Sequence, residues 1–170
     1  GRAELLRSVY VAATRIALAV FAAIAIPVIV YAQELLTAWV GPRYSGDAIV
    51  LVILAIAGFA KVATLPSLLM LQGIDRHRPL VVFAVGAAVL NIALAIPLAH
   101  SNGVKGVAYA TLIALGAELA AAVPYGVRTL RVPVGELLGR ALAPAVLAGI
   151  PAVVIALLLR ESLAPDTLLG

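Results

Sequence analysis

The stretch Ala48–Leu71 reads AIVLVILAIAGFAKVATLPSLLML and carries a single charge, Lys61. Thirteen uncharged residues (48–60) precede the lysine and thirteen more (62–74) follow it. A helix rises about 1.5 Å per residue, so this stretch is long enough to cross a hydrocarbon core about 30 Å thick. It therefore predicts a transmembrane helix that holds an ammonium group near its middle.

A charged group at that depth needs surroundings other than lipid. An ammonium there costs at least about 2.5–3.5 kcal/mol on insertion scales. On a helix, Ala57, Gly58 and Thr64 share the face of Lys61, and all three are small or mildly polar. We therefore expect Lys61 to face a cavity or an acidic partner, with Thr64 beside it. The alternative is a lysine whose chain extends to the nearer headgroups.

The composition assigns the chain to a class. Of the 170 residues, 64% are hydrophobic and 12% are charged, whereas a soluble domain is about half apolar and about a quarter charged. This excludes a soluble domain and predicts an all-α, polytopic transmembrane helical bundle. The net charge of +4 lies mainly between the apolar stretches and predicts no nucleic-acid partner. The chain has no cysteine, and therefore no thiolate metal site.

The hydropathy pattern predicts a single transmembrane region of five spans, with polar segments between them. Residues up to Thr14 show apolar positions at helical spacing and predict an amphipathic lead-in at the membrane surface. Gln33–Asp47 and Tyr125–Arg140 are predicted as loops, the second with a short surface-lying segment. Gly73 suits the end of a span and Pro79 the start of the next. The spans are expected at about 12–33, 48–71, 79–99, 104–124 and 141–159.

The basic residues predict an orientation in the membrane. The N-terminal segment, Gln72–Arg78 and Tyr125–Arg140 together hold seven arginines, against three basic residues in the alternate segments. The positive-inside rule therefore predicts a multi-pass protein of the cytoplasmic (inner) membrane with the N-terminal end of this chain inside. Within this scheme Arg76-His77-Arg78 is a topology signal beside anionic lipid, and Arg15 extends from the cytoplasmic end of its span.

Few residues suggest catalysis. The chain has no Walker P-loop and no GxGxxG motif, and Ser and Thr are scattered without a neighbouring base. His77 and His100 fall on opposite sides of the membrane in the predicted topology, so they cannot share a metal ion. We expect neither an enzyme nor a bound metal or cofactor.

Two further polar residues lie inside predicted spans. Glu118 is about 21 Å into its helix, close to the depth of Lys61. The two could form a pair, or both could line one aqueous cavity; the small neighbours on both faces favour separate, hydrated groups. Asn91 is expected to join helices or to bind a ligand. Gly106, Ala110 and Ala114 recur every fourth residue, a pattern that lets membrane helices pack closely.

Several motifs together resemble those of a known family. They are Leu36-Thr37-Ala38-Trp39-Val40-Gly41-Pro42-Arg43-Tyr44, Leu71-Gln72-Gly73-Ile74-Asp75-Arg76-His77-Arg78, Asn91, and Asn102-Gly103-Val104-Lys105-Gly106-Val107-Ala108-Tyr109-Ala110-Thr111. In this order and spacing, over about Arg7 to Val123, they resemble the polysaccharide (oligosaccharide-lipid) flippases of the multidrug/oligosaccharidyl-lipid/polysaccharide exporter superfamily.

The resemblance implies a transporter of about twelve to fourteen helices in two lobes. This chain would be a fragment of it, forming most of the C-terminal lobe, with the N-terminal lobe, membrane lipid and a lipid-linked sugar as partners. Such proteins move precursors of lipopolysaccharide or exopolysaccharide across the membrane by alternating access. The resemblance implies that Lys61 faces the central cavity and meets the substrate's diphosphate or an acidic sugar. The alternatives are a cation-coupled multidrug exporter of the same superfamily and a non-transporting membrane scaffold subunit.

Overall fold

The computed structural model describes residues 2–137 and, beyond them, positions 139, 140, 143, 147, 149, 151, 153–155 and 158. Between residues 2 and 137 every regular secondary-structure element is a helix. The elements are α1 (Arg2–Val30), α2 (Ala32–Trp39), the 3-10 helix η1 (Pro42–Asp47), α3 (Ala48–Gly73), α4 (Arg78–Asn102), α5 (Val104–Leu130) and α6 (Val134–Leu137).

Four helices in the described part of the chain, α1, α3 with its preceding η1, α4 and α5, are long and apolar enough to cross a membrane. This confirms the predicted class, an all-α helical membrane bundle. Helix α1 contains the predicted span 12–33 except for its last three residues. Helices α3 and α4 contain the predicted spans 48–71 and 79–99, and α5 contains 104–124 and continues beyond it. The predicted fifth span, 141–159, lies largely outside the described residues.

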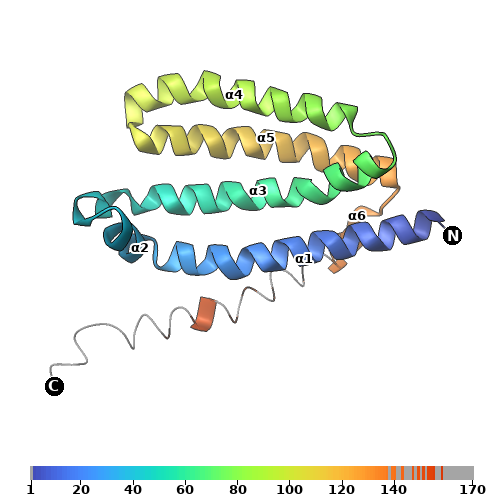
Figure 1. Ribbon diagram of the computed structural model, residues 1–170, viewed down its shortest axis with the longest axis horizontal. Helices are drawn as coiled ribbons and strands as arrows, with labels where there is room; N and C mark the ends of the chain where they lie inside the picture. The colour runs from blue at the N-terminus through green and yellow to red at the C-terminus, as the bar shows by residue number, and fades with distance from the viewer. Residues whose placement is uncertain are drawn as a thin grey trace.

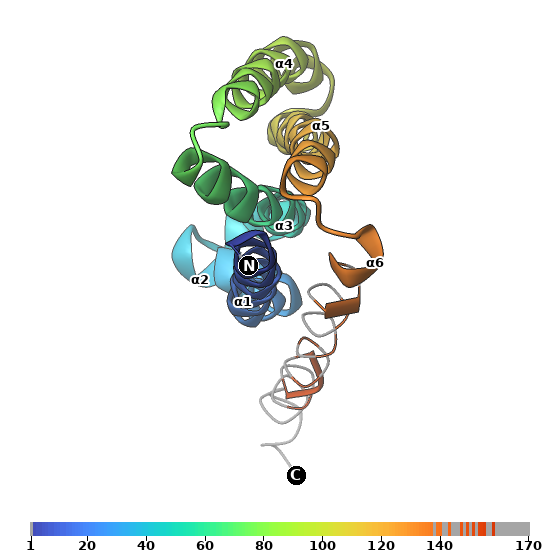
Figure 2. The same cartoon turned by 90° about the vertical axis from the view of Figure 1, so that its right-hand side faces the viewer.

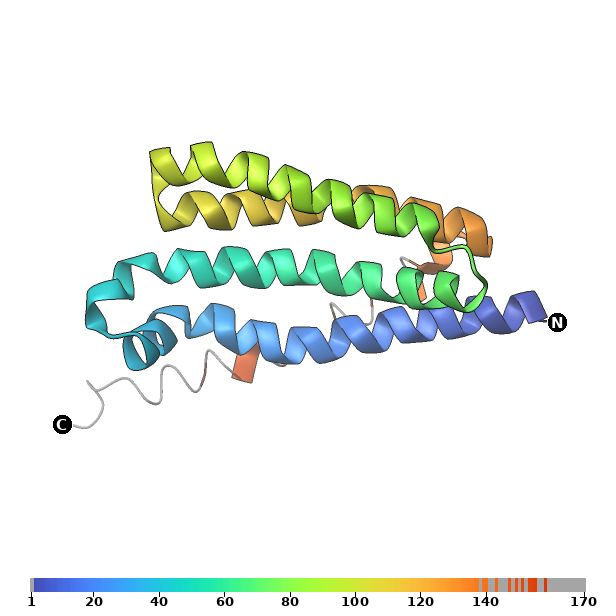
Figure 3. The same cartoon turned by 45° about the horizontal axis from the view of Figure 1, so that its top comes forward.

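The four long helices lie side by side with their axes roughly parallel or antiparallel (Figures 1 and 3). Viewed end-on they form a bent row in the order α1, α3, α5, α4 (Figure 2), and each helix packs against its neighbours in that row. Helices α3 and α5 are therefore central. Helix α4 is at the edge of the row, and its buried residues are only Leu80 and Ala87.

Small residues determine how closely the central helices approach. Apart from Pro66, the buried positions of α3 alternate in steps of four and three, and six of the buried positions of α5 recur every fourth residue. Both spacings keep one narrow face of a helix against its neighbour. The positions are Ile53, Ala57, Ala60, Thr64, Ser67 and Leu71 on α3, and Gly106, Ala110, Ala114, Glu118, Ala122 and Gly126 on α5. The predicted close-packing role of residues 106, 110 and 114 agrees with their burial.

The apolar core lies at the end of the bundle where α1 begins and α5 ends (Figure 1). It includes Tyr10 and Val11 of α1, so the N-terminal segment is not a lead-in on the membrane surface. Instead α1 is one continuous helix from Arg2. Val132 and Leu137 also lie in this core, so the segment around α6 packs against the bundle.

Two further boundaries differ from the prediction. The segment predicted as the first loop is mostly helical, because α2 and η1 occupy it; its run from Gln33 to Trp39 contains good helix formers. Helix α5 continues past Pro124 to Leu130 and ends at Arg131, which adopts a left-handed conformation. A proline inside a membrane helix is tolerated where neighbouring helices support the backbone, so α5 is longer than the predicted span.

The connections of α4 are short. Gly103 alone joins α4 to α5, with φ of 58° and ψ of −137°, a conformation that is costly for residues with a side chain. Before α4, the chain leaves α3 at Gly73, as expected, and Pro79 lies in the first turn of α4. The left-handed residue in that turn, however, is Asp75, with φ of 54°.

The two ends of α4 supply a test of topology. We expect Ile74→Cys and Asn102→Cys, two exposed sites, to react with an impermeant maleimide from opposite sides of the membrane, residue 102 from outside. The cysteine-free parent chain is the unlabelled control. The 25 residues of α4 separate its ends by about 37 Å, enough to cross the core. Labelling of both sites in intact cells would contradict this topology.

Candidate functional site

The two charged residues predicted inside spans meet between the central helices. The Nζ of Lys61 on α3 donates to both carboxylate oxygens of Glu118 on α5, at 2.8 Å to Oε1 and 3.1 Å to Oε2. A charge-assisted pair of this geometry is stronger than a neutral hydrogen bond. The pair therefore fixes the positions of α3 and α5 relative to each other near the middle of both helices.

The two partners differ in exposure. The side chain of Glu118 is 8% exposed, whereas that of Lys61 is 46% exposed. Glu118 belongs to the buried every-fourth-residue face of α5, between Ala114 and Ala122. A lysine ammonium has three donors, and Glu118 accepts two of these hydrogen bonds. The pair is thus a buried carboxylate joined to a cation that remains accessible.

Lys61 and Glu118 also line a cavity of about 350 Å³ between α3, α4 and α5. Apart from these two residues, Thr64 and Gln72, its walls are apolar. The remaining lining residues are Leu65 and Leu68 of α3, Leu80, Val81, Ala84, Val85 and Ala88 of α4, and Ala122 of α5. A mostly apolar cavity with a few convergent polar groups is the usual form of a small-molecule site.

The structure corrects the expectation that Lys61 and Glu118 are separate hydrated groups. They are paired, because the small residues around them bring α3 and α5 into contact instead of leaving a watery gap between the two helices. The expectation that both line a cavity does agree with the geometry. Close packing lies on one side of the pair, and the cavity on the other.

The other two predicted site residues have different surroundings. Thr64 is buried and lines the cavity, but its Oγ1 donates to the carbonyl of Lys61 at 2.7 Å. Asn91 is not among the residues lining this cavity. Its Nδ2 donates to Thr111 Oγ1 at 3.2 Å, which joins α4 to α5. Of the two roles left open for Asn91, this contact favours helix pairing.

Sequence reasoning missed a polar contact in the core. Tyr10 of α1 is completely buried, and its hydroxyl lies 3.0 Å from Ser67 Oγ on α3. Gly126 of α5 faces the same serine, and an added Cβ would lie 2.5 Å from Ser67 Oγ. Three helices therefore meet at one hydroxyl pair. Tyrosine at position 10 appeared only as one apolar position of an amphipathic pattern, so the sequence carried no signal for its partner.

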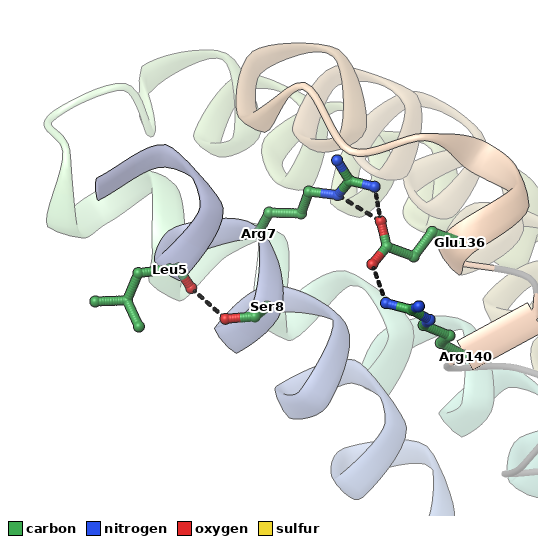
Figure 4. Close-up of polar contacts among 5 residues, drawn as sticks. All are labelled: Leu5, Arg7, Ser8, Glu136 and Arg140. Carbon is green, nitrogen blue, oxygen red and sulfur yellow. Dashed lines mark hydrogen bonds and ion pairs between the residues drawn. The ribbon is translucent and has the colours of Figure 1, made fainter. Parts of the chain in front are cut away.

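A second ionic group lies where α6 meets α1. The carboxylate of Glu136 accepts hydrogen bonds from Arg7 on α1 and from Arg140, the latter at 2.9 Å (Figure 4). The four-residue spacing of Glu136 and Arg140 is typical of an ion pair on a helix, so the sequence could have revealed the Glu136–Arg140 contact. The contact with Arg7, 129 residues away, could not be read from spacing.

No family model, curated protein or solved structure matches this chain. The geometry of the pair and its cavity therefore stands as the main structural observation on function, beside the motif resemblance described above.

Proposed function

We propose that this chain is part of a membrane transporter that moves a lipid-linked oligosaccharide across the cytoplasmic membrane by alternating access, and that Lys61 contacts the substrate. The observation that carries the proposal is the Lys61–Glu118 pair on the wall of the 350 Å³ cavity. Charged residues inside membrane spans commonly mark substrate or ion pathways. The motif resemblance to oligosaccharide-lipid flippases supports the same function.

The chemistry of the cavity suits such a substrate. Lipid-linked sugars combine an apolar chain with an anionic diphosphate, and this cavity combines apolar walls with one accessible ammonium. Glu118 holds that ammonium in place while the site is empty. A phosphate oxygen would compete with the carboxylate for the Lys61 donors, so substrate binding would loosen the link between α3 and α5. Loosening a contact between packed helices would then trigger the rearrangement that alternating access requires.

Transport should depend on the Lys61 charge. We expect Lys61→Met, in the full-length protein, to reduce flipping of a lipid-linked sugar at least tenfold, as expected for loss of one charged contact worth about 1.4 kcal/mol or more. The readout is complementation of a strain that lacks its own flippase, with membrane insertion checked by immunoblot. Lys105→Met is the matched control, because Lys105 is paired with Asp47 outside the cavity. Normal transport by Lys61→Leu would contradict a substrate role.

The pair also supports a second candidate, a non-transporting scaffold subunit. An ion pair whose charges satisfy each other can serve only to lock two helices. If Lys61→Met and Glu118→Gln destabilise the fold but transport in the full-length protein survives in the double variant, the scaffold role is favoured. A cation-coupled exporter would instead lose activity with Glu118→Gln alone and retain it with Lys61→Met.

A further inference from the structure

A second cavity, of about 430 Å³, lies between α1 and the segment around α6. Four residues on one face of α1 line it, and the opposite wall carries both charges of the Glu136–Arg140 pair. The lining residues are Ser8, Val11, Ala12 and Arg15 on α1, with Glu136, Gly139 and Arg140 opposite. None of them lines the Lys61 cavity, so an inference about this site does not depend on the proposed transport function.

Positive charge is in excess around this cavity. Glu136 is in contact with two guanidinium groups, those of Arg7 and Arg140 (Figure 4). Arg15 is exposed and makes no hydrogen bond or ion pair within the described part of the chain. Two arginines therefore contact the carboxylate, and a third, Arg15, lines the same cavity. A guanidinium carries five donors, and Glu136 occupies one of those on Arg140, so donors remain for an anion.

The position of Arg15 along α1 indicates what kind of anion can reach the site. Arg15 is the last charged residue before eighteen uncharged ones, Ile16–Gln33. The contacts of Tyr10 with Ser67 and of Phe21 with Phe59 nevertheless place the backbone of Arg15 roughly level with Lys61 of α3. Its side chain can extend back along α1 towards Ser8, which lines the same cavity, so an anionic group that enters from the N-terminal end of α1 can reach the guanidinium. Val11 and Ala12 add an apolar wall beside it. Basic pockets between membrane helices on the cytoplasmic side are known to hold anionic headgroups.

We propose that this cavity is a binding site for a phosphate group, with Arg15 as its principal ligand and Arg140 as the second. Guanidinium matches phosphate oxygens with two parallel hydrogen bonds, which an ammonium cannot do. Glu136 positions Arg140, and Arg7 offsets the repulsion that this carboxylate would exert on the anion. The phosphate group belongs either to an anionic membrane lipid or to a soluble phosphate compound.

The test uses the full-length protein in a nonionic detergent. Dioleoylphosphatidylglycerol is titrated in, bound lipid is counted by native mass spectrometry, and inorganic phosphate is then added as a competitor. We expect saturable binding that Arg15→Gln weakens about tenfold, equivalent to about 1.4 kcal/mol, and that Arg15→Lys weakens less. The matched control is Arg128→Gln, an exposed arginine in the last turn of α5 at the same end of the bundle (Figure 1).

Each result has a defined meaning. Loss of lipid binding in Arg15→Gln but not Arg128→Gln, without competition by phosphate, supports a lipid headgroup site. Competition by millimolar phosphate supports a site for soluble phosphate compounds. Equal losses in Arg15→Gln and Arg128→Gln would show only general attraction to a basic surface, and would overturn the proposal, as would non-saturable binding. Circular dichroism of both variants verifies that their helices are intact.

Discussion

Gly106→Ala should destabilise the bundle by about 3 kcal/mol, the upper end of the usual cost of overpacking. At this position an added Cβ would lie 1.9 Å from the carbonyl oxygen of Leu98 on α4 and 2.3 Å from its carbonyl carbon. Both are backbone atoms, which no rotamer change can move. The two helices would have to separate at the end where Gly103 joins them, so the contact cannot relax by a local shift.

Gly116→Ala is the matched control, since it is the same substitution on the same helix. An added Cβ at Gly116 meets no atom within 4 Å, so we expect stability to be unchanged or slightly higher, because alanine favours helix. The measurement is the free energy of unfolding in detergent, followed by helical circular dichroism. Equal effects of the two substitutions would show that α4 and α5 are not held as closely as the structure indicates.

Much of the fold could be predicted from the sequence because membrane spans leave strong local signals. Uncharged stretches of about twenty residues indicated α1 and α4, an apolar stretch interrupted only by Lys61 indicated α3, and the Gly106–Ala110–Ala114 spacing indicated a close-packed face on α5. The helix ends were less predictable. Pro124 is a local signal for a break, but its neighbouring helix packs well enough to keep α5 intact to Leu130.

The candidate site was predicted only in part, for a physical reason. Depth in the membrane is read from residue number, so Lys61 and Glu118 could be placed at the same level. Whether they touch depends on the rotation of each helix about its axis, which tertiary packing determines. The same limit hid the Tyr10–Ser67 contact and the Arg7–Glu136 contact, whose partners are far apart in the chain.

The Lys61–Glu118 pair should respond unequally to loss of either partner. Lys61→Met leaves a carboxylate that is 8% exposed without its cation, and we expect this to cost about 3 kcal/mol, at the low end for breaking a buried pair. Glu118→Gln leaves an ammonium that is 46% exposed to the cavity. That group is less buried than the carboxylate, so we expect its loss of stability to be smaller than that of Lys61→Met.

A double-mutant cycle on the free energy of unfolding in detergent measures this asymmetry. The double variant, Lys61→Met with Glu118→Gln, should be more stable than Lys61→Met alone, because no uncompensated charge remains buried. Lys105→Met is the control: its pair with Asp47 spans 3.6 Å with side chains 42% and 44% exposed, so the cost should stay below about 1 kcal/mol.

If the two single effects simply add, the pair contributes no coupling, and any transport lost in Lys61→Met then reflects contact with substrate alone. A large coupling together with lost transport would mean that the same ammonium both locks the central helices and meets the substrate, so that binding and helix release share one donor group.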